Sequence, residues 1–202
     1  MLDKILRSPK EQMLSPVAYR LLRPIHPTSI TITAWAIGMF AAIAAWQQAY
    51  LLALLLWVLN RLLDGLDGTV ARIHQKQTDL GGYLDVLLDT SIYCALPLGL
   101  ALAANTPAVY LNLALLLGSF YLNTASWMYL AALLEKRQHG ANAQQELTTV
   151  TMPGGLIEGL ETMIFFALFL LFPASIGPLF AIMALLVVVT VIWRLSWAIR
   201  HV

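Results

Sequence analysis

Two stretches, NRLLDGLDGTVAR at residues 60–72 and GGYLDVLLD at residues 81–89, place four aspartates in an otherwise apolar part of the chain. The two members of the first pair are three residues apart, and those of the second pair are four apart. On helices, each pair therefore shares one face. The short linker between the pairs predicts that the two helices are antiparallel neighbours, so that all four carboxylates converge on one point. The four residues are Asp64, Asp67, Asp85 and Asp89.

The composition around these acids is that of a membrane protein. Of the 202 residues, 59% are hydrophobic and only 11% are charged, with a mean hydropathy of +0.74. A soluble domain carries about a quarter charged residues, so most of this surface lies outside water. A net charge of +1 gives no case for binding nucleic acid. One cysteine, Cys94, excludes an internal disulfide and any cysteine-based metal cluster.

Six stretches predict an all-α integral membrane fold with six transmembrane helices. The second stretch reaches spanning length only if it includes Asp64 and Asp67, so it is the least secure by hydropathy. The stretches are residues 30–46, 50–63, 80–104, 109–134, 155–172 and 176–197.

The distribution of basic residues predicts the orientation. With six spans, all twelve Lys and Arg fall on one side, and the loops on the other side are uncharged. By the positive-inside rule, the basic side and both termini are cytoplasmic. Residues 1–28 form a juxtamembrane segment whose first 24 residues alternate apolar and basic groups, which favours an amphipathic helix lying along the interface over a merely solvated tail. Residues 29–202 form the six-helix domain.

The aspartates need compensation in this setting. A carboxylate near the membrane centre costs about 2.5 to 3.5 kcal/mol, and four together also repel one another. Arg72 and Lys76 alone are too few and lie toward the water. Hard divalent cations with oxygen ligands, one or two Mg²⁺ or Mn²⁺ ions, fit the four carboxylates better. The alternative is a polar patch that lines a water-filled vestibule, which does not explain the spacing of two pairs.

Glycines and an arginine accompany the acids. Gly65 and Gly68 each follow an aspartate and leave room for a ligand against the backbone. Gly81 lies at a helix start, where free backbone N–H groups suit an anion. Arg72 lies about two turns after Asp64 and can offer a guanidinium fork to a phosphate. Together these residues predict a site for a diphosphate ester.

The pattern Asp64-x-x-Asp67-Gly68-x-x-Ala71-Arg72, eight residues, Gly81-x-x-x-Asp85-x-x-x-Asp89 resembles the signature of the CDP-alcohol phosphotransferases at all eight fixed positions. The resemblance implies transfer of a substituted phosphate from a CDP-linked donor to an alcohol, with release of CMP, in phospholipid biosynthesis. In the usual bacterial case the donor is CDP-diacylglycerol, the enzyme lies in the inner membrane with its active site facing the cytoplasm, and it is a homodimer.

The resemblance also implies roles for individual residues. Two divalent ions, Mg²⁺ or Mn²⁺, are held by the four aspartates, and Asp89 is the general base that deprotonates the acceptor. The positions that match nucleotide-binding residues of the family are Gly68, Arg72, Thr78, Gly81 and the entry to the first span at Thr28. Related proteins often have Pro-Asn at that entry, where this chain has Pro27-Thr28.

The acceptor alcohol is not assigned by any motif. Glu158 and Glu161, three residues apart at the predicted start of the fifth span, suit a polyol or an amine-bearing alcohol better than a phosphate. The alternative is that they are helix N-terminal acids that favour the macrodipole, and the sequence supports both equally.

A function of another class is a small cation-coupled transporter, because intramembrane acids also mark ion pathways. Such a path usually places acids near mid-membrane or along both halves of the bilayer. Here the half that faces the uncharged loops carries no charge, which favours a one-sided enzyme site.

Overall fold

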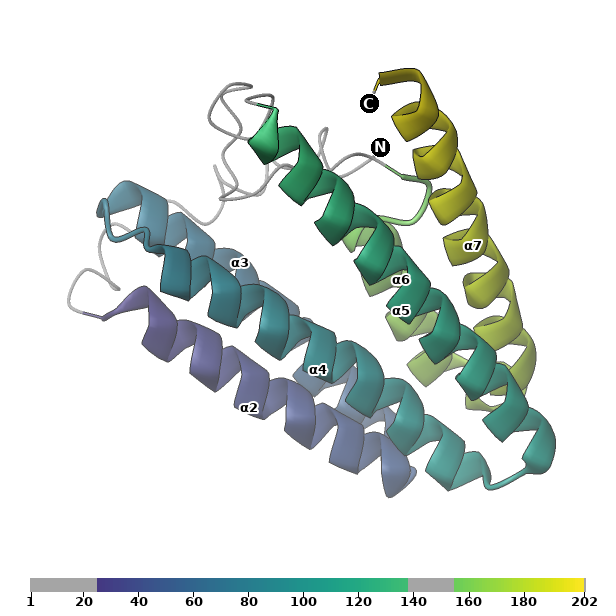
Figure 1. Cartoon of the computed structure of the whole chain (residues 1–202). Helices are drawn as coiled ribbons and strands as arrows, with labels where there is room; N and C mark the ends of the chain where they lie inside the picture. The colour runs from purple at the N-terminus through teal and green to yellow at the C-terminus, as the bar shows by residue number, and fades with distance from the viewer. Residues whose placement is uncertain (1–24, 138–154, 202) are drawn as a thin grey trace.

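The protein is a bundle of α-helices in the computed structural model, which describes residues 25–137 and 155–201 (Figure 1). Within these residues there is no strand, so the predicted all-α class is confirmed. The predicted interfacial helix over residues 1–24 lies outside the described residues. The elements are α2 (Pro27–Trp46), α3 (Tyr50–Ile73), α4 (Asp79–Ala104), α5 (Pro107–Lys136), α6 (Gly159–Leu171), the 3-10 turn η1 (Pro173–Ser175) and α7 (Ile176–His201).

Threonines set the starts of two long helices. The Thr78 hydroxyl accepts a hydrogen bond from the backbone N–H of Gly81 at 3.0 Å, which caps α4. The Thr106 hydroxyl accepts from Val109 N–H at 3.4 Å, and Pro107 occupies the first position of α5, where its missing N–H costs nothing. These caps fix where each helix begins, and therefore how the side chains of α4 and α5 are phased.

Four of the described helical segments are long and apolar enough to cross a membrane: Pro27–Trp46, Asp79–Ala104, Pro107–Lys136 and Pro173–Arg200. Helix α3 is not among them because it carries too many charged residues, and α6 is not among them because it has only 13 residues. The predicted start of the fifth span at residue 155 is wrong. Glu158 is the N-cap of α6, because its side chain and that of Glu161 form a capping box, so the helix begins at Gly159.

The helices fall into two groups, which Figure 1 shows diverging from the α4–α5 turn toward the C-terminal end of α7. In the first group α2 packs along both α3 and α4, and in the second α5 packs along α7. Glycines permit the close approach in the first group. A Cβ at Gly99 of α4 would lie 2.4 Å from the Ala42 carbonyl oxygen of α2, and one at Gly38 would lie 2.6 Å from Ile92 Cδ1.

The predicted neighbours α3 and α4 do contact each other, for example at the Trp57 and Tyr93 rings, but through side chains rather than close backbone packing. The backbone of α2 packs closely against both, whereas the backbones of α3 and α4 scarcely approach each other. The small residues of α2, among them Ala34, Gly38, Ala41 and Ala45, explain this arrangement because they let α2 lie close to both partners. Helices α3 and α4 meet instead through long side chains that carry the site.

Aromatic side chains join the two groups. Trp57 of α3 stacks on Phe166 of α6 with ring centroids 5.0 Å apart, and Tyr93 of α4 meets the same ring edge-on at 5.5 Å. Phe169 continues the row and contacts Phe180 of α7, with centroids 5.0 Å apart. The three phenylalanines and Trp57 are fully buried, so this row is the core on which the polar residues of α3 and α4 rest.

Candidate active site

The four aspartates lie on α3 and α4, as the sequence predicts, but in different degrees of burial. Asp67 is 6% exposed, whereas the side chains of Asp64 and Asp89 are each 24% exposed, and Asp85 is half-buried. The first pair and the second pair therefore face a common region between α3 and α4, at the end where α3 finishes and α4 begins.

Arg61, one turn before Asp64, is the cation in this region, and the sequence analysis did not single it out. Its Nη2 donates to Asp89 Oδ1 at 2.6 Å and its Nη1 donates to Asp89 Oδ2 at 2.9 Å. This is a two-pronged, charge-assisted pair, the strongest form of arginine–carboxylate contact. Nη1 also lies 3.8 Å from Asp64 Oδ2. Arg61 is only 4% exposed, so the pair is shielded from water.

Other side chains fix the guanidinium of Arg61. Its Nε donates to Asn60 Oδ1 at 2.7 Å, and Asn60 Nδ2 in turn donates to the Ala34 carbonyl of α2 at 2.8 Å. Nη1 also donates to the Tyr93 hydroxyl at 3.2 Å. The guanidinium carbon lies 4.8 Å from the Trp57 ring centroid and 5.6 Å from that of Tyr93, within the range of cation–π attraction. One network thus ties α2, α3 and α4 together.

Convergence of the four aspartates on one metal site stays a prediction. Among residues 25–137 and 155–201, no three His, Cys, Asp or Glu side chains are grouped as they stand for holding a metal ion. At Asp89, Arg61 occupies both carboxylate oxygens. The prediction counted Arg72 and Lys76 as the nearby cations and counted Arg61 only among the twelve basic residues on the cytoplasmic side.

Asp67 still fits a cation. Its Oδ2 atom is buried and has no hydrogen-bond partner, which is costly for a carboxylate oxygen. A hard divalent cation with oxygen ligands satisfies such an atom without a proton donor. The donor set of four carboxylates from two helices is the type that Mg²⁺ and Mn²⁺ prefer. The residues therefore fit the predicted kind of ion, although their present arrangement is not a finished ligand cage.

The predicted nucleotide residues lie at the same end of α3 and α4. A Cβ at Gly68 would lie 3.2 Å from Arg72 Nη1, so this glycine gives the guanidinium of Arg72 its place along α3. Thr78 and Gly81 are joined in the cap of α4. Thr28 lies in the first turn of α2, where its backbone N–H donates to Nδ1 of His26 at 3.3 Å. Their contact with a nucleotide stays a prediction.

The predicted acceptor residues are engaged in capping α6. Glu158 Oε1 accepts from Gly155 N–H at 2.8 Å, and Glu161 Oε2 accepts from Glu158 N–H at 3.2 Å. These bonds support the alternative, helix N-terminal acids, and a role in acceptor binding stays a prediction. Nearby, Arg194 of α7 donates from Nη1 to Asn123 Oδ1 at 2.8 Å and is 5% exposed. It is a second buried arginine, for which the sequence supports contact with an acceptor phosphate and topology anchoring equally.

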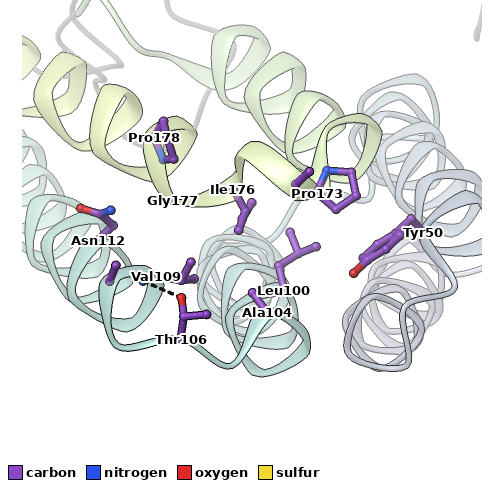
Figure 2. A pocket seen from close by; sticks show the side chains of 12 residues that line it. Tyr50, Leu100, Ala104, Thr106, Val109, Asn112, Pro173, Ile176, Gly177 and Pro178 are labelled. Carbon is purple, nitrogen blue, oxygen red and sulfur yellow. Dashed lines mark hydrogen bonds between the residues drawn. The ribbon is translucent and has the colours of Figure 1, made fainter.

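A cavity of about 430 Å³ lies at the start of α3 and the end of α4, which is the opposite end of these helices from the aspartates (Figure 2). Tyr50, Leu100, Val109, Ile176 and their neighbours make its wall mostly apolar. No acidic or basic side chain lines it, and its polar groups include the Thr106 hydroxyl that caps α5. The cavity therefore lacks the groups that phosphate chemistry needs, and the acidic region between α3 and α4 remains the candidate active site.

At one end of this membrane bundle, α3 and α4 carry acids, arginines and a glycine that makes room for a guanidinium. These features define a class, a membrane-embedded enzyme that handles phosphate esters. Comparison with known proteins then fixes the family. The profile of the CDP-alcohol phosphatidyltransferases matches residues 24–195, and the chain belongs to that family. Its members are metal-dependent transferases that move a substituted phosphate from a CDP-linked donor to an alcohol.

Individual relatives agree with this assignment. The chain is 38% identical over 175 residues to the inner membrane protein YnjF of Escherichia coli, covering 86% of this chain and 84% of that protein. It is 27% identical over 188 residues to the bifunctional IPC transferase and DIPP synthase of Thermococcus kodakarensis, covering 92% of this chain but only 42% of that protein. The fold matches the phosphatidylinositol phosphate synthase of Mycobacterium tuberculosis with CDP-DAG bound, at a TM-score of 0.70 and 22% identity over 92% of each chain.

Proposed function

We propose that this protein transfers a phosphatidyl group from CDP-diacylglycerol to an alcohol and releases CMP. The donor is inferred from the family and from the structural neighbour, whose crystal structure contains CDP-DAG. The chain is further proposed to cross a bacterial inner membrane six times, with both termini and the site on the cytoplasmic side, and to act as a homodimer. The one-sided distribution of Lys and Arg and the likeness to an inner membrane protein support this placement.

The observation that carries the proposal is the buried Oδ2 of Asp67 in a region with three further aspartates. We propose that Asp64, Asp67 and Asp85 hold one divalent ion, and that Asp64, Asp85 and Asp89 hold a second. The neighbour from Mycobacterium tuberculosis has also been solved with manganese, which supports Mn²⁺ or Mg²⁺ here. When bound, such ions neutralise the diphosphate and stabilise the charge that develops on the leaving CMP.

Asp89 is proposed as the general base. In the transfer, the acceptor oxygen forms a bond to the phosphorus of the phosphatidyl group, and the bond from that phosphorus to the oxygen bridging to CMP breaks. The proton of the acceptor hydroxyl passes to a carboxylate oxygen of Asp89, whose side chain is 24% exposed and contacts Arg61 of α3. Arg72, placed along the helix by Gly68, is proposed to hold the donor's phosphate.

The acceptor is proposed to be a hydroxyl compound that enters between α3, α4 and the start of α6. Relatives named archaetidylinositol phosphate synthase and IPC transferase handle inositol phosphates, and a 38% identity over 86 residues links this chain to the former from Aeropyrum pernix. Such acceptors carry a phosphate, for which buried Arg194 offers a guanidinium near the start of α6. A polyol or amino alcohol bound by Glu158 or Glu161 is the second candidate.

The transporter alternative predicts acids along a path through the whole bundle. In the described residues the acids of α3 and α4 lie at one end, and the cavity at the other end has no charged lining. This arrangement favours the enzyme.

The test is an assay of the purified protein in detergent micelles with CDP-diacylglycerol and either Mn²⁺ or Mg²⁺. CMP release is followed with inositol phosphate, glycerol 3-phosphate, serine, glycerol and amino alcohols in turn. We expect CMP release that needs both a divalent ion and one acceptor class, and that stops in EDTA. Absence of metal-dependent CMP release with every acceptor, and with soluble CDP-alcohols as donors, would refute the assignment.

A further inference from the structure

We propose that Arg61 is a latch on Asp89, which a divalent cation must partly displace before Asp89 can serve as its ligand. Arg61 stands outside the eight-position signature, so nothing in that motif assigns it a role. The inference rests on the proposed metal site and adds to it a positively charged side chain that competes for one of the ligands.

The first step in the argument is the geometry of the pair. Both oxygens of Asp89 accept from Arg61, at 2.6 and 2.9 Å, and Oδ2 also lies 3.5 Å from the Tyr93 hydroxyl. A carboxylate held by both oxygens presents its lone pairs to the guanidinium rather than to the region where Asp64 lies. In the part of the chain that is described, no three acids are grouped as metal ligands, and Asp89 is engaged by this fork.

The second step is that Asp89, rather than Arg61, is free to move. Arg61 is fixed by Asn60 at Nε, by the Tyr93 hydroxyl at Nη1, and by the ring faces of Trp57 and Tyr93. Arg61 is 4% exposed, whereas the Asp89 side chain is 24% exposed. A rotation of the Asp89 side chain therefore opens the fork, and the guanidinium stays behind in its aromatic cage.

The third step is the effect on charge. A guanidinium at hydrogen-bond distance from Asp89, and 3.8 Å from Asp64, offsets the mutual repulsion of the acids. It also repels any cation that approaches the same carboxylates. Without the guanidinium, the acids lose stability when no divalent ion is bound and gain affinity for the ion. The lower stability without the ion and the higher affinity for the ion both follow from removing one positive charge.

The experiment follows thermal unfolding of the purified full-length protein in EDTA and across a Mn²⁺ titration. Arg61→Gln is expected to unfold at a lower temperature in EDTA, and to reach half of its Mn²⁺-induced stabilisation at about a tenfold lower Mn²⁺ concentration. Arg61→Lys keeps the charge but lacks the two-pronged contact, and it is expected to shift the unfolding temperature and the Mn²⁺ midpoint less. Tyr93→Phe, which keeps the ring and removes the hydroxyl hydrogen bond, is expected to shift least in the same direction.

Arg194→Gln is the matched control, because Arg194 is also buried but donates to Asn123 of α5, and the acid near it is Glu158 rather than an aspartate of α3 or α4. It is expected to lower the unfolding temperature and to leave the Mn²⁺ midpoint unchanged. An equal or higher Mn²⁺ midpoint in Arg61→Gln overturns the latch, as does a matching shift in Arg194→Gln. If Arg61→Gln does not fold, unchanged midpoints in both Arg61→Lys and Tyr93→Phe overturn it. Wild-type protein with neither Mn²⁺ stabilisation nor CMP release refutes the metal site itself, and with it the latch.

Discussion

The described residues include two buried arginines, one in each group of helices, and their surroundings differ. Arg61 in the first group forks onto the carboxylate of Asp89, whereas Arg194 in the second group donates to the amide and backbone oxygens of Asn123 and also lies within electrostatic reach of Glu158. Replacing one partner of a buried ion pair leaves an uncompensated charge, which costs more than losing a neutral hydrogen bond. The comparison indicates that Arg61 is tied directly to one of the predicted metal ligands, whereas Arg194 joins α7 to Asn123 of α5.

The largest effect is expected at Asp89, because this is where the charged group meets the proposed chemistry. Asp89→Asn removes a proton acceptor and is expected to lower the rate of CMP release by at least about 100-fold while CDP-diacylglycerol still binds. Steady-state assays together with nucleotide binding measure the two properties separately. Gly118→Ala in the second group, where a Cβ would meet no atom within 4 Å, serves as the control and is expected to retain turnover. Full turnover by Asp89→Asn would contradict the assignment of the base.

A stability effect is expected next, at the contact that holds the first group together. In Gly99→Ala the new methyl group would meet the Ala42 carbonyl, so α2 and α4 must separate. We expect a loss of about 1–3 kcal/mol in the free energy of unfolding. Gly118→Ala is the control, because a Cβ there would meet no atom within 4 Å. Equal unfolding temperatures for the two variants would show that the close packing of α2 on α4 is not important for stability.

Donor binding offers a smaller effect within the same group. Gly68→Ala crowds the Arg72 guanidinium and is expected to raise the KM for CDP-diacylglycerol about tenfold, the worth of one weakened charged hydrogen bond. The kcat at saturating donor is expected to change much less. A fall in kcat at an unchanged KM would instead place Arg72 in the chemical step. Gly118→Ala again controls for the added methyl group.

The smallest effect is expected in the second group, at the cap of α6. Glu158→Gln weakens the capping box that Glu158 forms with Glu161 and is expected to cost about 1 kcal/mol of stability. If the residue acts only as a cap, the KM for the acceptor stays constant across the acceptor panel. A rise in that KM with unchanged stability would favour the acceptor role over the cap.

The sequence predicted the helices well and their packing partly. Hydropathy located every described helix, because apolar runs between uncharged turns leave few alternatives in a membrane. It misplaced the start of α6, since the Glu158 capping box is a local hydrogen-bond pattern inside an apolar stretch. It made α3 and α4 antiparallel neighbours, and their side chains are in contact, but a short linker does not specify that α2 packs closely against both.

The site shows the same division. Spacing placed the four aspartates at one end of α3 and α4, since side-chain faces follow from helical geometry. The pairing of Asp89 with Arg61 was missed, because it joins residues 28 positions apart and depends on the position of α2. A signal was nevertheless present in the sequence. Arg61 and Asp64 are three residues apart in an apolar run, so they share a helix face and carry opposite charges.

The turn between α4 and α5 is the single chain connection between the two groups of helices. Asn105 closes α4 in a left-handed conformation, with φ 47° and ψ 49°, and its side-chain oxygen accepts from the Tyr110 hydroxyl at 3.0 Å. During biosynthesis, the ribosome therefore delivers all four aspartates together with Arg61 before any residue of α5. The first group of helices therefore enters the membrane already containing Arg61 as a counter-ion. Partial neutralisation of its aspartates does not depend on the second group.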